Sequence, residues 1–204
     1  LSVLGQTERA VSEIEQAPLV VLGSRGLGGF SGLLIGSTGV QVAAHALCPV
    51  IVVRPVSGAP PNSLTADQVV VGVDGSPLSV EALEFGFTEA VRLGVGVVAV
   101  HVAASHVPGD SSVDVLTEEH APQQARLLAE SLAGWQEKYP DVPIRRVLLG
   151  GHPGRALTEA SQGARLLVVG SRGLGGFREL LLGSVSHAVL YHAHCPVAVV
   201  HRQE

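Results

Sequence analysis

An internal repeat constrains this chain more than any other feature: residues 19–53 recur as residues 166–200 without a gap. Roughly three positions in five are identical, which indicates two copies of one structural unit. The string GSRGLGGF occupies residues 23–30 and again residues 170–177. We call residues 19–53 the first copy and residues 166–200 the second copy. Any fold of the chain has to accommodate this segment twice.

The two copies lie in different contexts. The match continues upstream, since Arg9, Ala10 and Glu13 correspond to Arg155, Ala156 and Glu159, but the part of the second unit from Asp67 up to Leu149 has no counterpart before Leu1. We therefore expect residues 1–55 to be the C-terminal half of a first unit and residues 67–204 to be a complete second unit. Residues 56–66 are the expected linker, since VSGAPPNS is rich in turn-forming residues. The half unit at the front and the absence of an initiating Met predict that the chain is a fragment of a longer protein or the product of a truncated reading frame.

Short apolar runs alternate with segments of helical periodicity along the whole chain, which predicts an α/β fold with a parallel sheet covered by helices on both faces. The expected strands are residues 1–4, 19–22, 50–53, 69–73, 95–102, 144–149, 166–169 and 197–200. The expected helices are residues 8–17, 37–46, 79–93, 118–139 and 154–162, with one more beginning near residue 184, and a long polar loop is expected over residues 103–117.

The glycine-rich turn of the second copy follows an apolar strand and precedes a helix. Its spacing is G-x2-G-x9-G-S, formed by Gly170, Gly173, Gly183 and Ser184. Glycines let the backbone approach a ligand closely, and a helix N-terminus favours anions, so the pattern predicts a phosphate site. The pattern is neither a Walker loop nor a dinucleotide fingerprint. A tight strand-to-helix connection selected for packing explains the glycines equally well.

Asp74 directly follows the apolar strand 69–73, as Gly170 follows strand 166–169. The carboxyl ends of parallel strands lie at one edge of a sheet, which is where ligands bind in such folds, so we expect Asp74 to lie near the glycine turn. There it could accept hydrogen bonds from sugar hydroxyls. The alternative is that Asp-Gly-Ser-Pro forms only an Asx turn that begins the next helix.

Composition limits the functional classes. The formal net charge is −5, which argues against a general nucleic-acid surface. No apolar run approaches the roughly 18 residues of a membrane span, and no basic segment precedes a signal cleavage site, so we expect a cytoplasmic protein without a membrane partner. Cys48 and Cys195 are expected to be small buried residues, although a disulfide between the copies stays open.

Catalytic and metal-binding signals are weak. No pair of carboxylates and no Ser-His-Asp set accompanies the glycine turn. His187, His192 and His194 cluster near one helix end, but their spacing matches no zinc template, and solvated or helix-capping histidines explain them better. We expect His101, which closes a strand, to be a hydrogen-bonded residue beside the pocket.

Taken together, VGVDGS at residues 71–76, HV at residues 101–102, the glycine string of the second copy and HCPV at residues 194–197 resemble the universal stress protein family. The chain is most similar to its tandem type, with the first unit incomplete. The resemblance implies a Rossmann-like fold that binds ATP or a related adenine nucleotide, with or without Mg²⁺. It also implies pairing of two units through their last strands, either within one chain or in a homodimer.

The resemblance also assigns site residues by position. It places Asp74 on the ribose and Val102 near the adenine. The remaining residues that it implies are Gly72 and Val73 for the adenosine, and Val169, Gly170, Gly173, Gly183, Ser184 and Val185 for the ribose and phosphates. In the first copy the glycines are intact, but the strand that would carry the aspartate is missing. We therefore predict that the first copy binds nucleotide poorly.

Three functional classes remain open at this point. The first is a nucleotide-binding regulatory module with slow hydrolysis at most. The second is an enzyme of adenylate chemistry, similar to the ATP pyrophosphatases, although SGGxDS is absent after the first strand of the complete unit. The third is a structural dimer without a ligand.

Overall fold

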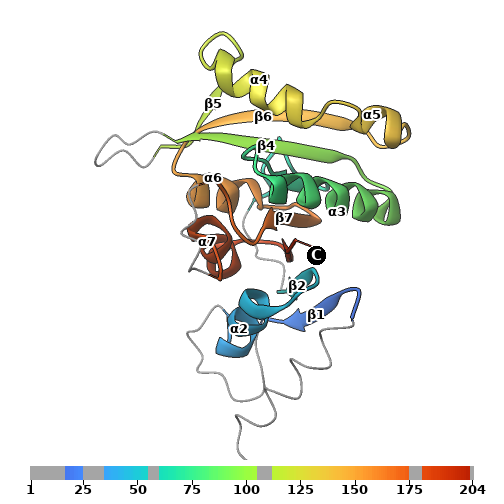
Figure 1. Cartoon of the computed structure of the whole chain (residues 1–204). Coiled ribbons are helices and arrows are strands. Elements are labelled where there is room, and N and C mark those ends of the chain that lie inside the picture. Colours follow the sequence, from blue (N-terminus) through green and yellow to red (C-terminus); the bar gives the residue numbers. More distant parts are fainter. Residues whose placement is uncertain (1–16, 25–34, 55–59, 105–111, 175–180, 203–204) are drawn as a thin grey trace, which may run out of the picture.

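The computed structural model describes residues 17–24, 35–54, 60–104, 112–174 and 181–202. These residues form one eight-stranded sheet of order β1-β2-β8-β7-β3-β4-β6-β5, with helices on both faces (Figure 1). The strands are β1 (Val20–Gly23), β2 (Val50–Val53), β3 (Val69–Gly72), β4 (Val97–Ala104), β5 (Asp114–Leu116), β6 (Ile144–Gly151), β7 (Leu166–Gly170) and β8 (Val197–Val200). The helices are α2 (Ser37–His45), α3 (Pro77–Leu93), α4 (Pro122–Ser131), α5 (Trp135–Lys138), α6 (Pro153–Ala160) and α7 (Ser184–His192).

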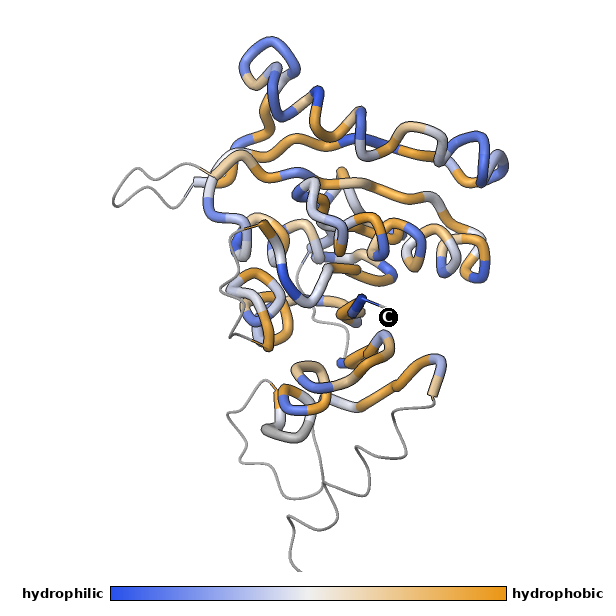
Figure 2. Tube along the Cα trace, viewed as in Figure 1, coloured by the Kyte–Doolittle hydropathy of each residue, from blue (hydrophilic) through white to orange (hydrophobic). Residues whose placement is uncertain are grey.

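Two hydrophobic clusters cover the two faces of the sheet. One joins the strands to α2, α6 and α7, and the other joins them to α3, α4 and α5. Figure 2 shows hydrophobic residues along the strands and hydrophilic residues on the outward-facing turns around α4 and α5. This arrangement confirms the predicted α/β fold with helices on both faces. Among the described residues, no helix combines the length and the hydropathy needed to cross a membrane.

Most neighbouring strands are parallel, as predicted, but two pairs are antiparallel. The first pair is β2 with β8, in which Ile51 lies opposite Ala198. This pairing confirms the expected contact between the last strands, and it occurs within one chain. The second pair is β5 with β6, in which Val115 lies opposite Leu149. The first copy and the second copy therefore belong to one continuous sheet.

Two expectations about the middle of the chain were wrong. The expected helix over residues 118–139 is divided into α4 and α5, because Gly134 has φ 81°, a left-handed conformation that ends a helix. The expected loop over residues 103–117 contains β5 at the sheet edge, and β4 continues to Ala104. The expected strand 1–4 and nearly all of the expected helix 8–17 lie outside the described residues.

The expected linker, residues 56–66, is described from Pro60 onward, and this part contacts α6. The Thr65 side chain is 1% exposed, and its hydroxyl donates to the Ala160 carbonyl at 2.6 Å. The Asn62 backbone N–H donates to the Gln162 carbonyl at 2.9 Å. Residues 60–66 are therefore fixed against the body of the protein.

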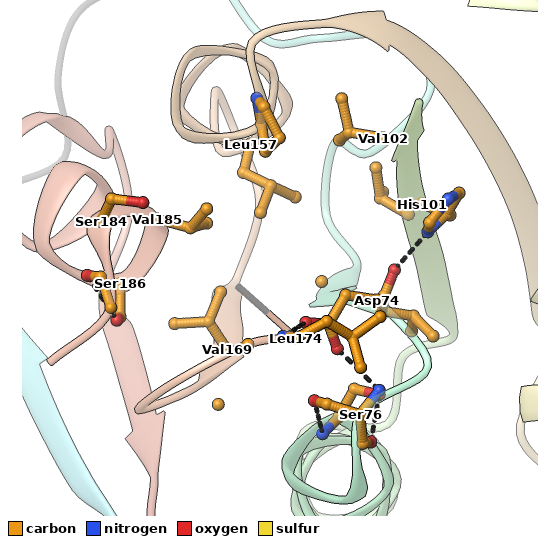
Figure 3. Close-up of a pocket in the computed structure, with 18 of the residues that line it drawn as sticks. Asp74, Ser76, His101, Val102, Leu157, Val169, Leu174, Ser184, Val185 and Ser186 are labelled. Atoms are coloured by element: carbon orange, nitrogen blue, oxygen red, sulfur yellow. Dashed lines mark hydrogen bonds between the residues drawn. The ribbon is translucent and has the colours of Figure 1, made fainter. Parts of the chain in front are cut away.

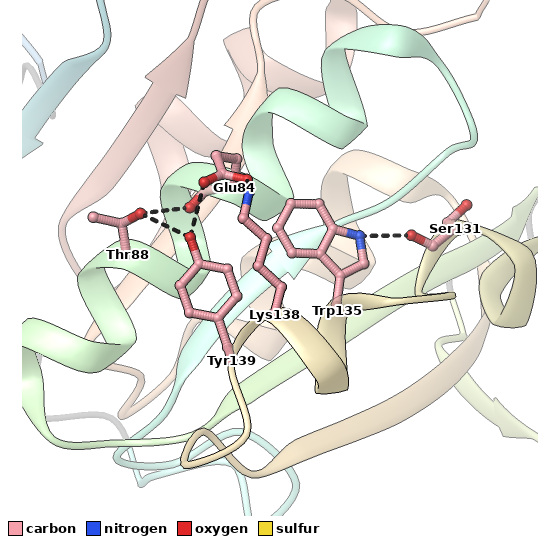
Figure 4. A network of polar contacts seen from close by, with 6 residues as sticks. All are labelled: Glu84, Thr88, Ser131, Trp135, Lys138 and Tyr139. Atoms are coloured by element: carbon pink, nitrogen blue, oxygen red, sulfur yellow. Dashed lines mark hydrogen bonds and ion pairs between the residues drawn. The ribbon is translucent and has the colours of Figure 1, made fainter.

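An aromatic stack attaches α5 to α3. The Phe87 ring lies 5.0 Å, centroid to centroid, from both the Trp135 ring and the Tyr139 ring. Glu84 accepts a hydrogen bond from the Tyr139 hydroxyl at 2.8 Å and pairs with Lys138 (Figure 4). Burial alone would raise the pKa of Glu84, but the hydrogen bonds from Lys138 and Tyr139, together with the charge of Lys138, outweigh it and lower the pKa. Aromatic packing and a charged contact thus hold the short helix in place.

We predict that Trp135→Ala lowers the free energy of unfolding by about 3 to 5 kcal/mol, because it removes a large, nearly buried ring. Trp135→Phe keeps the stack on Phe87 but loses the hydrogen bond to Ser131, so it should cost about 1 to 2 kcal/mol. Urea denaturation followed by far-UV circular dichroism measures both changes. Equal, small losses in the two variants would show that the stack does not stabilise the fold.

Candidate functional site

The candidate site lies at the carboxyl ends of β3, β4 and β7. The strand order places β4 on one side of β3 and β7 on the other, so the order of the strands reverses at β3, while all three strands run parallel. In open α/β sheets a crevice forms at such a point, because the loops leave the sheet toward opposite faces. Asp74 and Gly170 emerge there from neighbouring strands, as the sequence predicted.

A cavity of about 690 Å³ opens at this point (Figure 3). All ten residues that the sequence analysis assigned to the site lie on its wall; they are Gly72, Val73, Asp74, Val102, Val169, Gly170, Gly173, Gly183, Ser184 and Val185. The volume is in the range of small-molecule sites, about 300 to 1,000 Å³. Residues from four strand ends and three helix starts thus form one pocket.

Asp74 connects two sides of the cavity. One carboxylate oxygen accepts from the Ser76 backbone N–H at 2.9 Å, which confirms the Asx turn. The other accepts from the Leu174 backbone N–H at 2.9 Å. Ser76 in turn caps α3, since its hydroxyl oxygen accepts from the Ser79 N–H. Asp74 therefore holds the glycine turn of β7 against the end of β3, which the sequence did not predict.

Close backbone packing fixes the glycine turn. The Ser171 N–H donates to the Val200 carbonyl, and the Gly183 N–H donates to the Ser171 carbonyl, both at 2.8 Å. The Ser186 hydroxyl also donates to the Ser171 carbonyl at 2.8 Å. A Cβ atom at position 173 would lie 2.4 Å from an Asp74 carboxylate oxygen, so only glycine fits without a shift. The two ends of the turn are thus held beside the cavity; residues 175–180 lie outside the described part.

The N-terminus of α7 also faces the cavity. Its first intrahelical bond runs from the His187 N–H to the Gly183 carbonyl at 2.9 Å, so the N–H groups of the preceding three residues have no partner within the helix. Gly183 is the N-cap and provides no capping side chain, and the first turn contains no acidic residue. These free donors and the helix dipole make the end of α7 suited to an anion.

The rest of the wall is mainly apolar. In Figure 3, Val102 and Leu157 lie across the cavity from Val169 and Val185. Arg172, in the glycine turn, adds one cation to the wall. The cavity therefore offers an apolar space beside a region of backbone donors and positive charge.

Sequence reasoning did not assign His152 or Leu157 to the site, and it placed His101 only beside it. All three line the cavity. His101 is hydrogen-bonded as expected, through its Nδ1 and the Val73 carbonyl at 2.7 Å. His152 lies at the junction of β6 with α6, and Leu157 lies within α6. The rule that ligands meet strand carboxyl ends could have indicated this junction.

The cysteines and histidines form no second site in the described residues. Cys48 and Cys195 are both buried and do not form a disulfide, so the open question of a disulfide is answered for this structure. Burial raises the pKa of the Cys195 thiol to about 12 and also raises that of Cys48. No described group of three potential ligands could hold a metal ion, and the His187 ring packs on Tyr191 instead.

The first copy reproduces the backbone frame of the turn. The Ser24 N–H donates to the Val53 carbonyl at 2.7 Å, and the Gly36 N–H donates to the Ser24 carbonyl at 2.9 Å. These bonds match those of Ser171 and Gly183. Among the described residues, however, β1 has no strand on the side where β7 contacts β3. The aspartate-bearing wall of the cavity therefore has no counterpart in the described part of the first copy.

One protein-family model matches most of this chain. The model of the universal stress protein family matches residues 6–54 and 65–201. A universal stress protein of Mycobacterium tuberculosis is 45% identical over 189 residues, which cover 90% of this chain and 62% of the relative. The chain thus spans about 62% of the length of that curated relative.

The fold agrees with that of a solved structure from the same family. The crystal structure of a universal stress protein from Archaeoglobus fulgidus has a TM-score of 0.66 at 24% identity, covering 96% of this chain and 66% of that one. A universal stress protein crystallised in complex with cAMP has a TM-score of 0.49 at 28% identity, covering 67% of this chain and 98% of that one. On the family model and the close relatives, this chain belongs to the universal stress protein family.

Proposed function

We propose that the chain is an adenine-nucleotide-binding regulatory protein and that ATP, with or without Mg²⁺, occupies the cavity of the second copy. One observation carries the proposal: an apolar space and a helix N-terminus with free N–H groups lie in one cavity at the switch point of the sheet. An adenine ring suits the apolar part, and a phosphate chain suits the donors and Arg172. Both membership in the family and the spacing of the glycine turn support the same ligand class.

In this proposal, different residues of the cavity wall contact different parts of the nucleotide. Val102 and Leu157 contact the adenine, and the amides at the start of α7 bind phosphate. Asp74 faces the ribose while it holds Leu174 in position. Mg²⁺, when bound with ATP, would neutralise phosphate charge and would be held mainly by the phosphates, since Asp74 is the only carboxylate among the described lining residues.

We propose binding with slow hydrolysis at most. Both oxygens of Asp74 accept backbone N–H groups, so this carboxylate is poorly placed to activate a water molecule. We also propose that the β2–β8 pairing within the chain takes the place of a homodimer through these strands, and that the protein acts in the cytoplasm. The tandem arrangement with an incomplete first unit is part of the same proposal.

Calorimetric titration with ATP tests the function. Asp74→Ala should weaken binding by about tenfold or more, because it frees Leu174 and removes the acceptor for the ribose. Arg126→Ala, on the exposed face of α4, is the matched control and should leave affinity unchanged. AMP, cAMP and GTP titrated in parallel identify the preferred nucleotide. A folded, nucleotide-free chain that binds none of the four would contradict the proposal and support a structural role.

A different experimental result would support the enzymatic alternative. Turnover of ATP to AMP and pyrophosphate, well above background and lost in Asp74→Ala, would replace the regulatory proposal with adenylate chemistry.

A further inference from the structure

Arg54 joins the two copies at the end of α7. It directly follows β2, and the antiparallel pairing of β2 with β8 brings it to the C-terminal end of that helix. Its guanidinium donates to the Leu190 carbonyl, to the Ala193 carbonyl at 2.7 Å and to the Tyr191 carbonyl at 3.5 Å. A residue that follows the first copy thus binds the last turn of the helix that begins at the cavity.

These contacts replace the usual ending of a helix. The C-cap of α7 is Ala193, with φ −58° and ψ 152°, so no left-handed glycine supplies the common C-terminal hydrogen bonds. The last carbonyls of a helix otherwise need outside donors, and a cation there is favoured by the helix dipole. Arg54 supplies both the donors and the charge.

The positive charge of Arg54 interacts with the C-terminal end of α7. No ion pair joins it to a carboxylate among the described residues. Burial is the main cause that lowers the pKa of Arg54, yet a guanidinium stays protonated in proteins. The half-buried cation is therefore stabilised mainly by the carbonyl dipoles of α7.

The equivalent position after the second copy is His201, and it makes the corresponding contact with the C-terminal end of α2. Its two ring nitrogens lie 3.0 Å from the Ala43 carbonyl and 3.2 Å from the Cys48 carbonyl, at the end of α2. Burial lowers the pKa of His201, so the neutral ring offers only one N–H. The contact on α7, at the copy with the complete cavity, is thus the one with a permanent charge and several donors.

Helix α7 links Arg54 to the cavity. The helix has nine residues, Ser184–His192, which corresponds to a length of about 13 Å. Its first three residues line the cavity, and its C-terminal end binds Arg54. A short helix moves largely as a rigid body, so fixing one end limits where the other can lie.

We propose that Arg54 is a positioning residue through which the first copy sets the nucleotide affinity of the cavity in the second copy. This proposal rests on the proposed function, because it names the regulation of that site. The interface between the copies then serves two purposes: it joins the sheet through β2 and β8, and it places the phosphate-binding end of α7.

Titration with ATP of the full chain and three variants tests the proposal. Arg54→Ala should weaken binding by about five- to tenfold, in the range of coupling between distant sites. Arg54→Lys keeps the charge and should restore most of the affinity. His201→Gln alters the corresponding contact at the end of α2 but not the contact of Arg54 with α7. The dissociation constant of this variant for ATP should therefore stay within about twofold of that of the parent. Equal affinities for Arg54→Ala and the parent, both folded, would overturn the proposal.

Hydrogen exchange without nucleotide separates this proposal from the proposed function. In Arg54→Ala, exchange should accelerate at residues 184–187, beside the cavity, as well as at residues 190–193. Acceleration confined to residues 190–193 would overturn the coupling and leave Arg54 as a local helix cap. If the parent chain binds no ATP, the proposed function fails, and the exchange at residues 184–187 alone decides whether Arg54 positions the start of α7.

Discussion

Gly173→Ala should lose ATP affinity by about tenfold or more while the protein stays folded. The new Cβ atom would lie 2.4 Å from the Asp74 carboxylate, which is closer than any real contact of this kind. Asp74 must then move and release the Leu174 N–H, so the glycine turn shifts relative to β3. Calorimetric titration gives the dissociation constant, and thermal unfolding shows that the fold is kept.

The internal repeat provides the control for this variant. Gly26 is the sequence counterpart of Gly173 in the first copy and lies outside the described residues. Gly26→Ala should leave ATP affinity unchanged, because the described part of the first copy has no aspartate-bearing strand beside β1. If Gly26→Ala weakened binding as much as Gly173→Ala, the nucleotide would have to contact the first copy as well.

The second large effect concerns two equivalent valines. Val168→Asp should destabilise the protein by more than about 4 kcal/mol, because Val168 is 0% exposed in the cluster under α3 and the new carboxylate would have no partner. Val21→Asp, at the equivalent position in β1, should cost less than about 1 kcal/mol, since Val21 is 57% exposed. Urea denaturation of both variants measures the difference.

The same pair of variants tests the exposed face of the first copy. Val53 is 43% exposed whereas its equivalent, Val200, is 3% exposed, so this difference extends over both β1 and β2. Helix α3 covers Val168 and Val200. Among the described residues, no corresponding helix covers Val21 and Val53. Similar losses for Val21→Asp and Val168→Asp would show that another segment or another chain covers this face in the folded protein.

Much of the fold could be predicted because its signals are local. The apolar runs at residues 69–73 and 166–169 match β3 and β7 to within one residue, and the repeat predicted that β1 and β2 resemble β7 and β8. The site could be predicted for a related reason. Carboxyl ends of parallel strands meet at one edge, so Asp74 and Gly170 had to be neighbours once the strands were correct.

The remaining features depend on tertiary contacts or on one backbone angle. The break between α4 and α5 depends on Gly134, which the helical periodicity concealed. β5 has only three residues and is stabilised by pairing with β6, so no local pattern marked it. The bond between Asp74 and Leu174 joins residues 100 positions apart, and the contact of Arg54 with α7 spans the two copies.

The central claim is that one chain holds one adenine nucleotide, in the cavity of the second copy. Native mass spectrometry of the purified chain in excess ATP counts the bound nucleotides directly. The account predicts one ATP per chain in the parent protein and in Gly26→Ala, and a lower occupancy in Gly173→Ala at the same ATP concentration. Two nucleotides per chain, or none in the folded parent, would contradict it.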